Sequence, residues 1–144
     1  MNRIICIGNR YIEKDALGAQ VYEYLSRLEL PADIELVDGG LAGLNLLPLM
    51  DNCERVIFVD AICGDEAQPV QVLRGDQLNG SRIYGHSSGL EYLLGAHNAL
   101  GGSQMASVFV VGAGMPDATE AVARLALEFA GGAELHFNME EERQ

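Results

Sequence analysis

The sequence has no tryptophan, few basic residues and no long apolar run. Nine lysine and arginine residues stand against 21 aspartate and glutamate residues, which gives a formal net charge of −12. Such a charge opposes binding to the phosphate backbone of nucleic acids and favours a cationic partner, of which a metal ion is one example. No apolar stretch reaches the ~18 residues of a membrane-spanning helix, so we expect no insertion into a membrane.

Cysteines are also few, and their spacing shows no paired motif. Cys6, Cys53 and Cys63 form no CxxC pair, so the sequence indicates neither a disulfide framework nor a cysteine-rich zinc site. Cys6 lies in the apolar run of residues 4–7, where a small buried side chain is a simpler interpretation than a nucleophile. That run is too short for a signal peptide, and we expect a cytoplasmic protein.

Strand-like and helix-like patterns alternate along the chain. This alternation is typical of βαβ units, so the sequence predicts an α/β fold with three layers, helix on sheet on helix, around a mostly parallel twisted sheet. The expected strands span residues 3–8, 34–37, 55–59, 70–74, 107–111 and 134–138, with 70–74 as the candidate edge strand. The expected helices span residues 16–30, 41–50 and 118–129, with a further one around residues 90–97.

Length and composition fit one domain with one core. The chain has 144 residues, of which 49% are hydrophobic and 21% charged, and no linker or internal repeat divides it. We expect a single domain over residues 1–139, followed by an acidic tail over residues 140–144. Seventeen glycines suit many tight turns between strands and helices, and Pro31 is placed to end the first helix.

Two aspartates follow predicted strands, at the edge where open α/β sheets bind ligands. Asp60 comes directly after the apolar run 55–59. A carboxylate there is costly unless it is paired, hydrogen-bonded or bound to a metal, although a helix cap or a turn is the alternative. Asp38 begins an Asp-Gly-Gly sequence, which a turn or a helix cap explains about as well as a functional role.

An acidic residue and a histidine precede two of the predicted helices. Asp15 stands just before the first helix, where an N-cap is the simple interpretation, and Glu13 competes for any acidic role there. His86 precedes the helix around residues 90–97, where it is either a metal ligand or an ordinary surface residue. His97 lies about 16 Å farther along that helix, too far from His86 to share an ion, and is interpreted as a helix-face residue.

Two aspartates and one histidine from separate loops would form a site with two oxygen ligands, one nitrogen ligand and open positions. Such a site suits Ni²⁺ or Zn²⁺, and the spacing does not choose between them. Other chemical motifs are absent: the sequence contains no GxSxG elbow, no HExxH pair, no Walker loop and no GxGxxG after the first strand.

Taken in order, the motifs of this chain resemble the NiFe-hydrogenase maturation endopeptidases. The similarity covers nearly the whole chain at spacings like those of the family. Departures from the family pattern occur at Cys6, Lys14 and Val70. The motifs that carry the resemblance are Gly8-Asn9, Asp15-Ala16-Leu17-Gly18, Asp38-Gly39-Gly40, Val59-Asp60-Ala61 and His86-Ser87-Ser88-Gly89-Leu90.

The resemblance implies an α/β enzyme that removes a short C-terminal extension from the precursor of a hydrogenase large subunit. It implies that Asp15, Asp60 and His86 bind nickel, and that this nickel is carried by the substrate as a sign of completed maturation. Asp38 matches a family aspartate implicated in activity, and we assign it as the candidate catalytic base.

Two other functions stay open at this point. The first is a non-catalytic metal-binding or assembly module that docks on a hydrogenase subunit without cleaving it. The second is a small nucleotide-binding α/β domain, which rests on analogy of fold alone. The absence of a glycine-rich fingerprint counts against the nucleotide-binding domain.

Overall fold

The fold is seen in a computed structural model, which describes residues 1–8, 11, 16–41, 43–62, 70–75, 89–100, 107–114 and 118–133. The expected strand over residues 134–138, the acidic tail and two of the expected metal ligands, Asp15 and His86, lie outside these residues. No helix in the described ranges is long and apolar enough to cross a membrane.

A five-stranded sheet forms the centre of the described fold. Its strand order is β2-β1-β3-β5-β4, and neighbouring strands are parallel except for β4, which runs antiparallel to β5 at the edge. The predicted α/β class and the edge position of residues 70–74 are therefore confirmed. The elements are, in chain order, β1 (Asn2–Ile7), α1 (Leu17–Ser26), β2 (Ile34–Gly40), η2 (Leu44–Met50), β3 (Val56–Ala61), β4 (Val70–Arg74), α2 (Gly89–Ala99), β5 (Val108–Ala113) and α3 (Thr119–Ala130).

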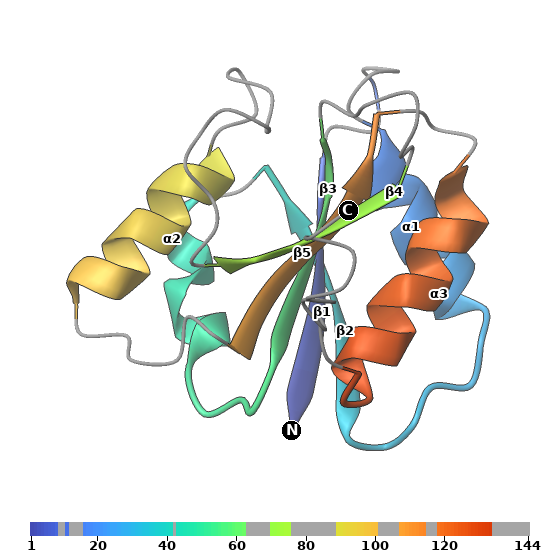
Figure 1. The fold of residues 1–144 in the computed structure, drawn as a ribbon, viewed down its shortest axis with the longest axis horizontal. Helices are drawn as coiled ribbons and strands as arrows, with labels where there is room; N and C mark the ends of the chain where they lie inside the picture. Colours follow the sequence, from blue (N-terminus) through green and yellow to red (C-terminus); the bar gives the residue numbers. More distant parts are fainter. Residues whose placement is uncertain are drawn as a thin grey trace, which may run out of the picture.

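Helices cover both faces of this sheet, as Figure 1 shows: α1 and α3 lie on one side, and α2 with the 3₁₀ helix η2 lies on the other. Each side has its own apolar cluster. Ile57 and Val59 of β3 belong to the cluster beneath α1 and α3, whereas Val56 and Phe58 belong to the cluster beneath α2 and η2. Because side chains alternate along a strand, these clusters assign every strand residue to one face.

Some boundaries differ from those that the sequence predicts. The first helix ends at Ser26 rather than at Pro31. The Arg27 and Leu28 amides donate hydrogen bonds to carbonyls three residues back, and this tighter bonding closes the helix before the proline. The short helix predicted over residues 41–50 is present as the 3₁₀ helix η2.

Strands β2 and β3 extend beyond their predicted ends. Asp38 pairs with Cys6 of β1, and Asp60 pairs with Gly112 of β5. Both aspartates therefore lie inside strands and not in the loops after them. Pairing with a neighbouring strand explains the difference, since it overrides the low preference of aspartate and glycine for extended structure.

The start of α1 packs directly on the end of β1. A Cβ atom at Gly18 would lie 2.0 Å from the carbonyl oxygen of Ile7 and 2.9 Å from the Ile7 nitrogen. Backbone meets backbone at this point, with no room for a side chain. This contact fixes the first turn of α1 at the end of a central strand.

Replacing Gly18 by alanine should therefore destabilise the fold. The methyl group overlaps backbone that cannot move aside, and we expect the free energy of unfolding to fall by about 3 kcal/mol. Gly95 is the matched control, because it lies in α2 with open space around its Cα. The Gly95→Ala variant should gain about 1 kcal/mol from the helix preference of alanine. Urea unfolding of both variants measures the two effects, and equal stability would contradict the packing described here.

Candidate functional site

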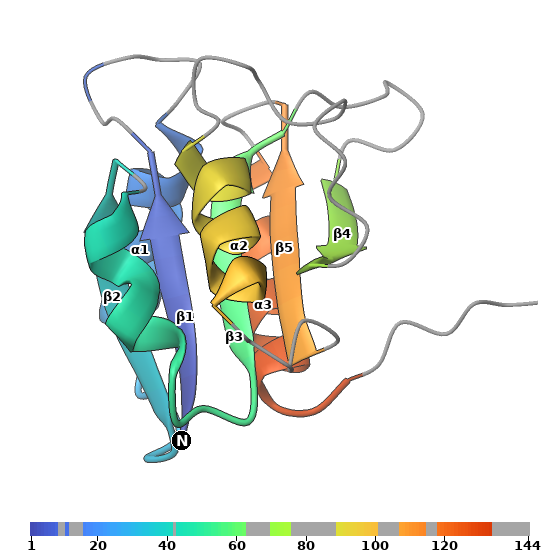
Figure 2. The same ribbon diagram turned by 90° about the vertical axis from the view of Figure 1, so that its left-hand side faces the viewer.

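The parallel strands β1, β2, β3 and β5 end at a common side of the sheet, called here the carboxyl edge. Figure 2 shows the tips of β1 and β5 on this edge and the first turn of α2 beside it. The contact between Gly18 and Ile7 places the start of α1 at the same edge. Open α/β sheets bind ligands at this edge, so the polar residues that lie on it are the candidates for a site.

Asp60 is buried completely, with 0% of its surface exposed, near the end of β3. Its Oδ1 atom accepts a hydrogen bond of 2.8 Å from the backbone N–H of Ala61. By alternation it shares the face of Phe58, which is the face covered by α2 and η2. Asp60 therefore occupies a paired strand position in the sheet.

Asp38 has a different environment, since it is exposed near the end of the edge strand β2. Its Oδ1 atom accepts a hydrogen bond of 3.1 Å from the backbone N–H of Gly40, and Gly40 has the positive φ of 56° that favours glycine. This local hydrogen bond is of the kind that the Asp-Gly-Gly sequence allows as an alternative to a functional role. Alternation places its side chain with Leu36, on the face covered by α1 and α3.

Asp38 and Asp60 lie at the same edge of the sheet but point to opposite faces. Both Asp38 and Val59, the neighbour of Asp60, pair with Cys6 of the strand between them. Two strand spacings of the usual size separate the aspartates by about 10 Å. Within the described ranges no three His, Cys, Asp or Glu side chains come together as a metal site, and the expected set also requires Asp15 and His86.

Sequence reasoning missed another polar residue, Gln71 of β4, which lies in the same row as Asp60. Gly112 of β5 pairs with Asp60 on one side and with Gln71 on the other. Gln71 is 7% exposed and shares the face of Leu73, beneath α2 and η2. In the sequence it stands between two valines, which is the pattern of an ordinary solvent-facing residue on an edge strand. Its burial could not be inferred from that pattern.

Cys6 lies close to the candidate site but is not suited to nucleophilic chemistry. Its side chain is 1% exposed and belongs to the apolar cluster beneath α1 and α3. Burial raises the pKa of the Cys6 thiol, and the nearby charge of Asp38 raises it further. The thiol is therefore protonated at neutral pH, and the interpretation of Cys6 as a small buried side chain is confirmed.

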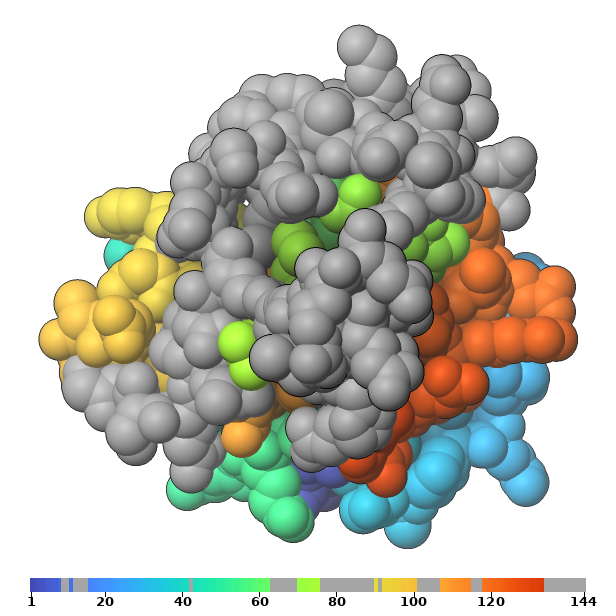
Figure 3. Space-filling model, viewed as in Figure 1, coloured from blue at the N-terminus to red at the C-terminus, as the bar shows by residue number. Residues whose placement is uncertain are grey.

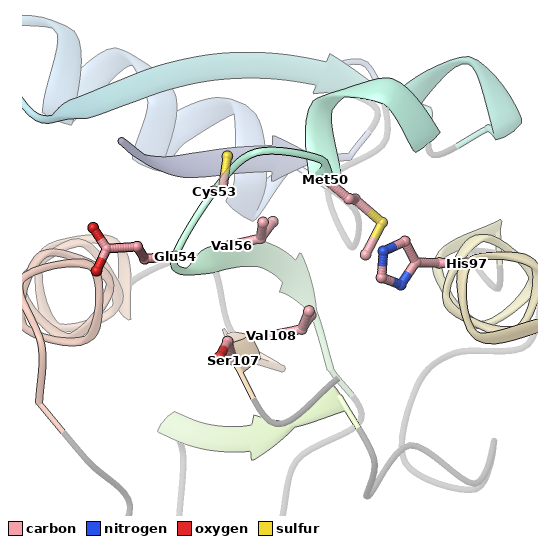
Figure 4. A pocket seen from close by; sticks show the side chains of 7 residues that line it. All are labelled: Met50, Cys53, Glu54, Val56, His97, Ser107 and Val108. Carbon is pink, nitrogen blue, oxygen red and sulfur yellow. The ribbon is translucent and has the colours of Figure 1, made fainter. Parts of the chain in front are cut away.

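A small cavity lies at the opposite end of the sheet, beside the first residues of β3 and β5. Its volume is about 10 Å³, which is about enough for one water molecule. Figure 4 shows the Met50 thioether and the His97 ring facing each other, whereas the Glu54 carboxylate points away. The cavity is thus remote from the carboxyl edge and is not the candidate site. It is lined by Met50, Cys53, Glu54, Val56, His97, Ser107 and Val108.

Comparison with known proteins identifies the family. The family model HycI, described as hydrogenase maturation protease, matches residues 19–128. The chain belongs to the hydrogenase maturation protease family. This range includes Asp38, Asp60 and Gln71, whereas the end of β1 and Gly18 precede it. The resemblance noted from the sequence motifs is confirmed.

Individual relatives agree with this assignment. The chain is 32% identical over 99 residues to the hydrogenase 2 maturation protease of Escherichia coli K12, an alignment that covers 65% of this chain and 60% of that protein. The chain thus matches less than two thirds of the length of that curated relative. It is also 28% identical to the solved structure of the hydrogenase maturating endopeptidase HybD from E. coli, with a TM-score of 0.66 and coverage of 88% and 87% of the two chains.

The raised pKa of Cys6 predicts a loss of stability at high pH. Between the unfolded thiol pKa, about 8.5, and the higher folded value, only the unfolded chain releases the Cys6 proton, so stability falls as pH rises. From pH 8 to pH 10 the wild type should lose about 2 kcal/mol more than Cys6→Ala. Urea unfolding of both proteins at both pH values measures this difference in lost stability. The contributions of the other titrating groups are the same in the two proteins and cancel. Equal losses in the two proteins would show that the thiol is not shielded as described.

Proposed function

We propose that this protein is an endopeptidase that removes the C-terminal extension from the large-subunit precursor of a NiFe hydrogenase after nickel has been inserted. Membership of the hydrogenase maturation protease family supports the peptidase activity and the hydrogenase substrate. The observation that carries the nickel-dependent part is the complete burial of Asp60 at the carboxyl edge.

Asp60 is suited to the recognition of a cation. A carboxylate that is removed from water is costly, and a cation bound beside it offsets that cost. Mixed carboxylate and imidazole ligands suit Ni²⁺. In this proposal the cation is the nickel ion of the precursor, so the metal belongs to the substrate and is not a resident cofactor.

Asp15 and His86 complete the proposed ligand set. In the sequence Asp15 directly precedes Ala16, the N-cap residue of α1, and His86 stands shortly before Gly89, the first residue of α2. Both helices begin at the carboxyl edge that carries Asp60. Two carboxylates and one imidazole would thus bind the nickel of the precursor and position the scissile bond beside it.

Asp38 is the proposed general base. A metal ion beside the scissile bond can polarise its carbonyl or activate a water molecule, and a base then accepts the proton that is released. The carboxylate of Asp38 is exposed at the carboxyl edge and points to the face opposite Asp60. A proton accepted by Asp38 would therefore pass to solvent and not to the buried carboxylate.

The first test compares nickel-loaded with nickel-free precursor. The purified protein should shorten the nickel-loaded precursor and leave the nickel-free form intact, because the ligand set requires the ion. Mass spectrometry of the large subunit measures the cleavage. Cleavage of both forms, or of neither, would refute the nickel-gated mechanism. Binding of the precursor with no change in its mass would favour the assembly module instead.

The second test replaces the buried carboxylate. Asp60→Asn keeps the size of the side chain and an oxygen for the Ala61 N–H, but it removes the charge, so processing should fall at least 100-fold while the protein stays folded. Asp51→Asn is the matched control, because Asp51 is an exposed aspartate that follows η2, and it should process at the wild-type rate. His86→Ala should also abolish processing. Full activity of both Asp60→Asn and His86→Ala would refute the ligand assignment.

A further inference from the structure

Asp60 and Gln71 are the two polar residues that the described part of the chain buries. They stand in one row of the sheet, because Gly112 pairs with Asp60 on one side and with Gln71 on the other. Both point to the face beneath α2 and η2. The burial of two polar side chains in one row at the carboxyl edge calls for a common explanation.

Gln71 lowers the stability of the folded protein at this position. Within the described ranges its Oε1 atom is buried and accepts no hydrogen bond. A buried carbonyl oxygen without a donor destabilises a protein, whereas an apolar side chain of the same shape would not. Leu73, which shares the face of Gln71, packs against the apolar cluster beneath α2 and η2. Packing alone would therefore favour an apolar residue in place of Gln71.

The buried side chain of Ile62 occupies the space between the two polar groups of the row. Two strand spacings separate Asp60 from Gln71 by about 10 Å, and the residue between them, Gly112, has no side chain. A Cβ atom at Gly112 would lie 2.6 Å from Cγ1 of Ile62, so Ile62 packs against this glycine. A carboxylate and a carboxamide thus flank a small apolar floor at the carboxyl edge.

We propose that Gln71 binds the peptide backbone of the precursor beside its nickel-bearing segment. A carboxamide carries an acceptor and two donors, so it can accept a hydrogen bond from a backbone N–H and donate one to a backbone carbonyl. The substrate contact is therefore with the main chain and is independent of the substrate's side chains. This inference rests on the proposed function, because it places Gln71 in the binding of the same precursor.

The strand that carries Gln71 is placed to meet a partner. β4 is the edge strand of the described sheet, next to β5 and two strands away from β3. Figure 3 shows that atoms of β4, drawn in light green, reach the molecular surface on the face viewed. A peptide that meets this edge strand would lie beside Gln71, while Asp60 stays buried in the same row.

The test is a kinetic comparison of Gln71→Met with the wild type on nickel-loaded precursor. Methionine keeps the length of the side chain and removes its hydrogen-bonding groups. We expect KM for the precursor to rise about tenfold, the value of one backbone hydrogen bond, with kcat changed less than twofold. The melting temperature should stay equal or rise, because a buried polar group without a partner is removed. Gln20→Met is the matched control, since Gln20 is exposed on α1, and its KM should equal that of the wild type.

The outcomes separate the inference from the function on which it rests. A wild-type protein that processes the precursor, together with an unchanged KM for Gln71→Met, overturns the role of Gln71 and leaves the proposed function standing. A raised KM with a lowered melting temperature also overturns it, because the residue would then be structural. A fall in kcat at constant KM also overturns the role of Gln71 in binding. A wild-type protein that does not process nickel-loaded precursor overturns the function and the inference together.

Discussion

Burial of the central strands from both sides is the constraint on which the rest of the structure depends. β1, β3 and β5 lie between the α1–α3 layer and the α2–η2 layer, so both faces of these strands must be apolar over most of their length. A polar side chain in such a strand has to be held where the strand ends. The position of Asp60 at the carboxyl edge follows from this requirement.

Close approaches of the backbone make that edge rigid. Gly18 brings the first turn of α1 against Ile7, and Gly112 brings β5 against the carbonyl of Asp60, where a Cβ atom would lie only 2.1 Å away. Neither approach tolerates a side chain, so the start of α1 is held against β1, and β5 is held against β3. Fixed positions of this kind suit the metal recognition proposed above, because the geometry of the ligands decides which metal ion binds.

The polar residues of the carboxyl edge differ in environment. Asp38 is exposed and accepts a hydrogen bond from the Gly40 N–H, while Asp60 is buried and accepts one from the Ala61 N–H. Gln71 joins Asp60 through the pairing of both residues with Gly112. An exposed carboxylate remains hydrated and a buried one does not, so the proposed function gives the two aspartates different tasks: exchange of protons with solvent and recognition of a cation.

The sequence by itself determined the α/β class and the family, because periodic apolar patterns and ordered motifs are local properties of the chain. It placed Asp60 after a strand, whereas pairing with Gly112 keeps Asp60 inside β3. It placed the end of the first helix at Pro31, whereas tighter hydrogen bonding ends that helix at Ser26. Only the tertiary structure decided that Asp38 and Asp60 face opposite sides of the sheet and that Gln71 is buried beside Gly112. Strand order and register bring together residues that are distant in the sequence, and no local pattern encodes that pairing.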